Sequence, residues 1–299
     1  MNWLLIIFIA YFLGAIAMVI DKAMLKKSIP EPLVYTFYIG LLGLIFIPLL
    51  MPFGFFVPDF DVILMSLVAG ILFIIALITF FNTLKVDDAS QVIPIIGGMS
   101  PLLILILAFF IAGEKLAINE LIALFIIVVG SFIISLDRHG KSWKISSRTL
   151  LLSFFAALFF AMSYSLTKKV YDQVDFLNGF IWTRLGALLT IFSLLFYPKF
   201  RQLLKKSSKK SKKQVKFIFL VGQAMAGISF LLVNYAISLG SVTITNALQG
   251  LQYVFLFIIV VILSKYRPKI IKEKIDRQTV VQKIVAIIII SLGLLLIAL

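Results

Sequence analysis

The 299-residue sequence contains no cysteine and only one histidine, His139. Disulfides and thiolate metal sites are therefore excluded, and a single histidine cannot build a histidine cluster. We accordingly expect neither a metal nor another cofactor. Charged residues are also scarce, because they make up 14% of the chain where a soluble domain carries about 25%. This shortage excludes a water-soluble enzyme or binding module.

Long apolar runs occupy most of the chain, which is 62% hydrophobic with a mean hydropathy of +1.13. A helix needs about 20 mostly apolar residues to cross the bilayer. Ten runs meet this requirement: 3–21, 33–51, 62–83, 89–113, 118–136, 149–167, 177–197, 216–239, 242–264 and 279–299. They are too long and too continuously apolar for barrel strands. The sequence therefore predicts an all-α integral membrane protein with ten transmembrane helices.

Basic residues are distributed unevenly between the loops that join these runs. Of the 28 Lys and Arg residues, 23 fall on the odd-numbered loops and three on the even-numbered loops. Because basic loops remain in the cytoplasm, this bias places both termini outside an inner or plasma membrane. The net charge of +15 then reflects loops that face anionic lipid, not nucleic acid. In the longest loop, 199–216, the lysine-rich stretch 205–213 is interpreted as a solvated charge run.

The two halves of the chain show a weak internal repeat. Matched pairs at fixed offsets are Ala15 and Ala161, Lys22 and Lys168, Gly40 and Gly186, Asn82 and Asn234, and Gly98 and Gly250. Gly130 in the fifth run also corresponds to Gly293 in the tenth. The basic bias inverts between the halves, as it must when each copy has five helices. We predict two inverted five-helix repeats, 1–137 and 149–299, joined by a cytoplasmic linker at 138–148.

A short motif then connects the chain with a known family. The sequence Gly113-Glu114-Lys115-Leu116 after the fourth run, with Gly130 further on, resembles the EamA-type transporters of the drug/metabolite transporter superfamily. The resemblance implies a secondary transporter, not an enzyme, that exports amino acids or related metabolites. The second half departs from the pattern, because Tyr266 stands where the acid is expected and Glu273 follows only later.

Arg184 is the main candidate for substrate binding. It lies near the middle of the seventh run, and no acidic residue lies comparably deep elsewhere in the chain. Charged side chains at such depth commonly serve a function. The planar guanidinium matches a carboxylate or a phosphate, so we expect Arg184 to bind an anionic group of the substrate. The alternative is that it reaches lipid headgroups or bonds to helix carbonyls.

Further polar residues complete the candidate site. The fourth run carries a polar face that aligns with the ninth run. The substrate-binding candidates are Arg184, Asn246, Gln249, Gln91, Asn82, Asn234, Tyr164 and Trp182. Structural roles in kinking and packing are expected for Pro94, Gly98, Pro101 and Gly250. For the amides and the aromatic residues, bonds between helices, helix capping and interfacial anchoring remain the alternatives.

These features predict a transporter that binds a small polar or anionic metabolite near the bilayer midplane. The two repeats would rock to alternate access to this site. Two rival classes stay open, namely a lipid-linked carrier or flippase and a membrane scaffold that transports nothing. The predicted partners are the substrate and the bilayer, without nucleic acid, and a monomer is compatible with the sequence.

Overall fold

The computed structural model describes residues 2–25, 31–43, 45–87, 89–136, 146–208, 213–266 and 277–298. Over these residues the chain is helical and contains no strand. The helices are α1 (Asn2–Leu25), α2 (Pro32–Gly43), α3 (Phe46–Leu50), the 3-10 turn η1 (Met51–Phe53), α4 (Phe60–Val86), α5 (Ala89–Ile111), α6 (Ile118–Ser135), α7 (Ser147–Tyr171), α8 (Phe176–Leu194), α9 (Pro198–Ser208), α10 (Lys213–Leu239), α11 (Val242–Ala247), α12 (Gly250–Tyr266) and α13 (Arg277–Ala298).

Ten stretches of the described residues are long and apolar enough to cross a membrane. They coincide with the ten runs predicted from the sequence, so the prediction of an all-helical membrane protein with ten spans is confirmed. Two of the spans are not single helices. One is made of α2, α3 and η1, and the other of α11 and α12.

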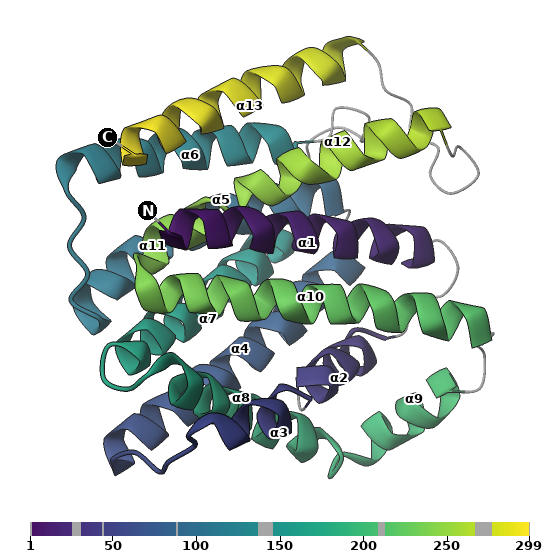
Figure 1. Cartoon of the computed structure of the whole chain (residues 1–299). Coiled ribbons are helices and arrows are strands. Elements are labelled where there is room, and N and C mark those ends of the chain that lie inside the picture. Colours follow the sequence, from purple (N-terminus) through teal and green to yellow (C-terminus); the bar gives the residue numbers. More distant parts are fainter. Residues whose placement is uncertain are drawn as a thin grey trace.

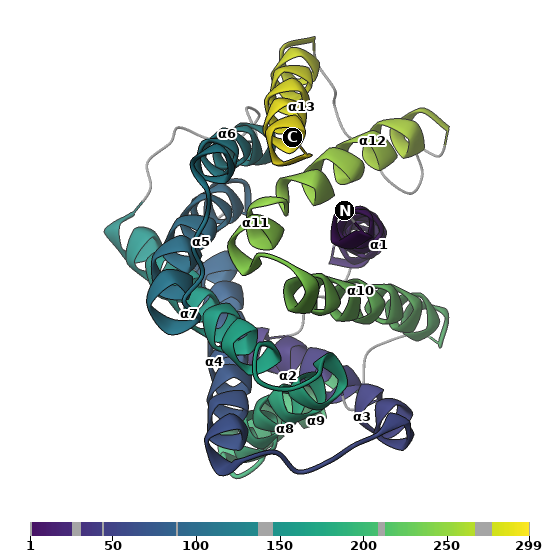
Figure 2. The ribbon, with the colours of Figure 1, turned by 60° about the vertical axis from the view of Figure 1, so that its left-hand side comes forward.

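Helices from the two halves of the chain interleave. α1 packs along α10 and α12, α4 packs along α7 and α8, and α6 packs along α13 (Figure 2). Sequence neighbours are not always packing neighbours: α4 and α5 are separated by only two residues, yet each packs mainly along α7. The start of α1 and the end of α13 lie at the same end of the bundle (Figure 1). The halves thus share several packing surfaces instead of meeting at one interface.

A close crossing between α4 and α8 fixes the depth of Arg184. An added Cβ on Gly70 would lie 2.0 Å from the carbonyl oxygen of Thr183, and one on Gly186 would lie 2.2 Å from that of Leu67. Only small residues allow two helix backbones to approach this closely. Because Thr183 and Gly186 flank Arg184 on α8, the crossing holds Arg184 at a defined level of the bundle.

The first part of the long basic loop 199–216 forms a helix, α9. Lys205, at the start of the predicted charge run, is exposed. Phe200 is fully buried, and its ring centroid lies 5.3 Å from that of Phe37 on α2, while Lys199 and Arg201 are exposed. Because Phe200 is buried against α2 while its basic neighbours face outward, α9 is an amphipathic helix. Residues 209–212 lie outside the described residues, as do linker residues 138–145 and Glu273.

Candidate functional site

Arg184 lies among three aromatic rings. Its guanidinium carbon is 4.4 Å from the ring centroid of Phe230, 5.0 Å from that of Phe73 and 5.4 Å from that of Phe180. The faces of aromatic rings attract cations. The Nε atom is buried and has no hydrogen-bond partner among the described residues. Aromatic faces from α4, α8 and α10 therefore hold this side chain.

Among the described residues, no carboxylate forms an ion pair with the Arg184 guanidinium. The sequence has no acidic residue between Asp175 and Glu273. Asp175 caps the start of α8, because its carboxylate accepts hydrogen bonds from the N–H of Asn178 at 3.1 Å and from its Nδ2 at 2.8 Å. A buried charge without a counter-ion is costly, so a bound anion would stabilise this arrangement.

Two tyrosines and an asparagine lie next to the rings around the guanidinium. The ring centroid of Tyr164 on α7 is 6.3 Å from that of Phe73. The Tyr171 hydroxyl donates a hydrogen bond of 3.1 Å to Oδ1 of Asn234, whose Nδ2 donates to the carbonyl of Phe230 at 2.9 Å. The structure thus brings together three predicted site residues. We define the Arg184 cluster as Phe73, Tyr164, Tyr171, Phe180, Arg184, Phe230 and Asn234.

The ninth span is broken where the sequence predicted a continuous helix over 242–264. In an unbroken helix, the carbonyls of Thr245 and Ala247 would accept hydrogen bonds from the N–H groups four residues further on. At the break those N–H groups donate to the residues three positions back instead, at 3.1 and 2.9 Å. Two backbone carbonyls therefore lose their usual partners. Interrupted helices of this kind are typical of transporter binding sites.

Hydroxyl groups from other helices occupy both carbonyls. The Tyr11 hydroxyl on α1 donates to the carbonyl of Thr245 at 2.6 Å, and the Ser131 hydroxyl on α6 donates to that of Ala247 at 3.4 Å. A buried carbonyl without a partner costs about 1–3 kcal/mol, so these bonds stabilise the break. Both donors belong to the first half of the chain.

Tyr11 lies in the same hydrophobic core as Tyr164 and Phe180 of the Arg184 cluster and Tyr253 on α12. Tyr253 in turn approaches α5, because its hydroxyl oxygen would lie 3.6 Å from a Cβ on Gly97. The break and the Arg184 cluster therefore border the same core.

The amides of the ninth span sit at the break itself. Asn246 is buried, and its Nδ2 donates to the carbonyl of Val242 in its own helix at 2.9 Å. Gln249 lies between α11 and α12 and is half-buried. In this conformation one amide hydrogen of Asn246 is bonded within α11. Gln249 is therefore the more accessible of the two side-chain amides.

Three other candidates lie outside the contacts that define the Arg184 cluster. Trp182 points to another side of α8, where it stacks on Phe55 at 6.0 Å and donates to the carbonyl of Phe56 at 3.3 Å. Two residues along a helix correspond to a turn of about 200°, which explains its separation from Arg184. Asn82 is half-buried near the end of α4, and Gln91 is buried near the start of α5 with its Oε1 unpartnered.

The residues expected to be structural lie at helix contacts. Pro94 and Pro101 are buried within α5, which continues through both. An added Cβ on Gly98 would lie 3.4 Å from the Phe132 ring, and one on Gly250 would lie 1.9 Å from the Ser131 hydroxyl. The two glycines therefore allow α5 and α12 to approach α6 closely.

Sequence reasoning missed the aromatic members of the cluster. The chain has 29 phenylalanines, and composition alone does not distinguish Phe73, Phe180 and Phe230 from those that face lipid. A usable signal was present in the helical spacing. Phe180 stands four residues before Arg184, and Phe230 four residues before Asn234, so each pair shares a helix face.

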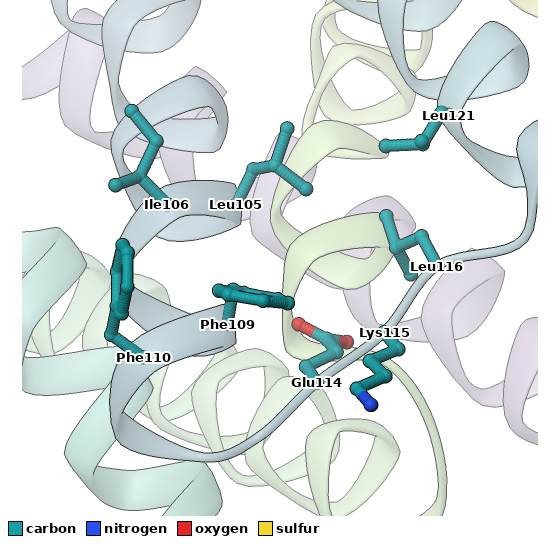
Figure 3. A pocket seen from close by; sticks show the side chains of 8 residues that line it. All are labelled: Leu105, Ile106, Phe109, Phe110, Glu114, Lys115, Leu116 and Leu121. Atoms are coloured by element: carbon teal, nitrogen blue, oxygen red, sulfur yellow. The ribbon is translucent and has the colours of Figure 1, made fainter.

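A pocket of about 500 Å³ lies elsewhere, where α5 ends and α6 begins. Its lining is mostly apolar, with Glu114 and Lys115 as the polar members (Figure 3). Phe110 on its edge is 76% exposed, as expected for a side chain that faces lipid. The pocket is separate from the Arg184 cluster and becomes relevant through Glu114.

Comparisons with known proteins relate the first half of the chain to a transporter family and the whole chain to a known fold. Residues 1–136 match the EamA-like transporter family. No curated protein matches the sequence. Solved structures do match, and one crystal structure with 14% sequence identity covers 100% of this chain and 98% of its own with a TM-score of 0.73. That identity shows the fold alone. The family match over the first 136 residues and the ten spans support a membrane transporter of the drug/metabolite type, in agreement with the EamA resemblance predicted from the sequence.

Proposed function

We propose that this protein is a secondary transporter that exports a small polar or anionic metabolite, such as an amino acid, across the cell membrane. The observation that carries the proposal is the position of Arg184, which lies in the bundle interior over three aromatic rings and has no acidic partner in the described part of the chain. A carboxylate or phosphate group of the substrate would bind the guanidinium, and the rings would exclude water from the pair.

Asn234, Tyr164 and Tyr171 lie next to the rings around the guanidinium and carry groups that can donate or accept hydrogen bonds. A second polar part of the substrate, such as an ammonium or a hydroxyl, would bind at the break between α11 and α12. Gln249 supplies an amide there, and the carbonyls of Thr245 and Ala247 would become available as acceptors when the hydroxyls of Tyr11 and Ser131 leave them. Both positions border the hydrophobic core that contains Tyr11.

Alternating access in this proposal rests on two inverted repeats with the boundaries given above. Reciprocal glycine contacts between α6 and α13 support such a relation, because equivalent residues meet across the pair. The breaks in the second and ninth spans supply positions at which helices can bend. Because the helices interleave, the moving units would be mixed groups of helices from both halves.

Transport in proteoliposomes tests the proposal. The purified protein is assayed against a panel of amino acids, organic acids and nucleobases. For an anionic substrate that is transported, we expect Arg184→Gln to weaken the apparent affinity by at least about ten-fold, the effect of losing a hydrogen bond to a charged group. Arg184→Lys should have a smaller effect, since it keeps the charge and loses the planar fork.

The matched control is Arg148→Gln, which removes an exposed arginine at the start of α7. It should transport with unchanged affinity. If both folded Arg184 variants bind the substrate with unchanged affinity, Arg184 does not belong to the binding site and has only a packing role. A folded protein that moves no member of the panel would favour a membrane scaffold, and transport of lipid-linked molecules alone would favour a flippase.

A further inference from the structure

The end of α5 places Glu114 at a defined position. Gly113 has a φ of +71°, a left-handed conformation that glycine adopts without strain. The N–H groups of Ala112 and Glu114 both donate to the carbonyl of Ala108, at 3.0 and 3.1 Å, and so close the helix. The left-handed turn at Gly113 therefore ends α5 and fixes the direction in which the Glu114 side chain leaves the chain.

The neighbour that Glu114 reaches is α11. Oε2 of Glu114 accepts a hydrogen bond of 2.5 Å from the hydroxyl of Thr243, a fully buried residue in the first turn of α11. Oε1 is buried and has no partner among the described residues. The carboxylate lies beside the Phe109 ring in the apolar pocket (Figure 3). One strong bond thus coexists with an unsatisfied oxygen, which would gain water if the contact opened.

Three side chains of the first half hold α11, which belongs to the second half. Thr243 bonds to Glu114, the carbonyl of Thr245 to Tyr11, and the carbonyl of Ala247 to Ser131. The half-helix is six residues long and lies at the end of the bundle where α1 begins and α13 ends (Figure 1). It is bounded by Gly240 and Ser241 on one side and by the break on the other.

We propose that α11 is the gate at this end of the binding site and that Glu114 is the positioning residue that keeps it closed. The proposal rests on the proposed function, because it takes the break and the Arg184 cluster as the transport path. Release of Thr243 lets the Glu114 carboxylate reach water and frees the first turn of α11. The half-helix then pivots at its two joints and opens the site on this side.

Side-specific labelling of a single cysteine tests the gate without any knowledge of the substrate. The chain has no native cysteine, so Ala247→Cys, at a position with 1% exposure, provides the only reactive thiol. A membrane-impermeant maleimide is added in turn to right-side-out and inside-out membrane vesicles. Glu114→Gln and Thr243→Val weaken or remove the bond, and Thr243→Ser is the matched control that keeps the hydroxyl.

We expect Glu114→Gln and Thr243→Val to increase the labelling rate by about ten-fold, the factor that corresponds to one hydrogen bond to a charged group. The increase should occur only from the side of the termini, whereas general destabilisation would raise labelling from both sides. Equal rates in the parent, Glu114→Gln and Thr243→Val would overturn the proposal, as would equally fast labelling of Thr243→Ser.

The labelling also separates the gate from the substrate site, because it requires no transported substrate. Arg148→Gln in the same background should label like the parent, because Arg148 is exposed at the start of α7 and belongs neither to α11 nor to the Arg184 cluster. A transport assay that fails for every substrate would contradict the proposed function and leave the labelling result standing. Normal transport kinetics together with unchanged labelling in Glu114→Gln and Thr243→Val would contradict the proposed gate and leave the proposed function standing.

Discussion

Gly130 of α6 and Gly293 of α13 occupy reciprocal positions where these two helices cross. An added Cβ on Gly130 would lie 2.7 Å from Cγ1 of Ile290, and one on Gly293 would lie 2.5 Å from Cγ1 of Ile127. Each glycine thus accommodates an isoleucine that stands three residues from the other glycine. Such an exchange of contacts is expected for a pair of helices related by an approximate two-fold axis. It supports the correspondence between the fifth and tenth runs.

Alanine substitutions at this crossing should destabilise the protein. Gly130→Ala and Gly293→Ala each force a methyl group against an isoleucine, which costs about 1–3 kcal/mol by overpacking. The better helix propensity of alanine offsets about 1 kcal/mol of this loss. Thermal unfolding in detergent should therefore show a lower midpoint for both variants. Gly43→Ala is the control, because no heavy atom lies within 4 Å of its added Cβ, and its midpoint should stay the same or rise.

The hydroxyl of Tyr11 should contribute more to stability than that of Ser131. Tyr11→Phe leaves the carbonyl of Thr245 without a partner in the interior, at a cost of about 1–3 kcal/mol. Ser131→Ala removes a longer bond of 3.4 Å, compared with 2.6 Å for Tyr11, and should cost less. Unfolding midpoints of the two variants provide the comparison. A larger loss in Ser131→Ala would contradict the account of how the break is stabilised.

Lys283 should act through stability and not through transport. Its ammonium donates to the carbonyls of Ile134 and Leu136 at the C-terminal end of α6, where the helix dipole favours a positive charge. Lys283→Met should destabilise the protein by about 2 kcal/mol, the value of bonds from a charged donor. Transport affinity should stay unchanged. Lys115→Met, which removes an exposed lysine, serves as the control with unchanged stability.

Single cysteines also test the orientation in the membrane. Ala117 and Ser147 are exposed next to an even-numbered and an odd-numbered loop, respectively. The bias of basic residues places them on opposite sides, with Ser147 in the cytoplasm. Ala117→Cys should react with an impermeant maleimide in right-side-out vesicles, and Ser147→Cys only in inside-out vesicles. The reverse pattern would invert the predicted topology, and reaction of both from one side would contradict it.

The sequence predicts the spans well because each helix had to satisfy its own backbone in lipid, which leaves long apolar runs as the readable signal. The same rule predicts the break in the ninth span poorly. Its carbonyls are satisfied by Tyr11 and Ser131, residues more than 100 positions away in the sequence. Local patterns do not contain such distant donors. The residues 242–264 therefore look like an ordinary helix.

Arg184 illustrates the corresponding limit for the site. Its charge made it visible in an apolar run, but its surroundings come from α4, α7 and α10, and these are assembled only by packing. Trp182 shows the converse limit. It is close to Arg184 in sequence and lies on another side of the same helix, against Phe55. Residues three or four positions apart share a helix face, so the sequence can predict which residues lie on the same face but not which other helices they contact.

The interleaved packing of the two halves also constrains how the protein is made. α1 packs along α10, and almost the entire chain between them must be synthesised before the two can meet. At ribosomal speeds of about 5–20 residues per second, α1 resides in the bilayer for roughly ten to forty seconds without that neighbour. Tyr11 waits about twice as long for α11 as Glu114 and Ser131 do, because 234 residues separate Tyr11 from its bonded partner, compared with 129 and 116 for the other two. Only α12 and α13 follow α11 in the chain, so the half-helix meets its partners late in synthesis, and α6 receives α13 last.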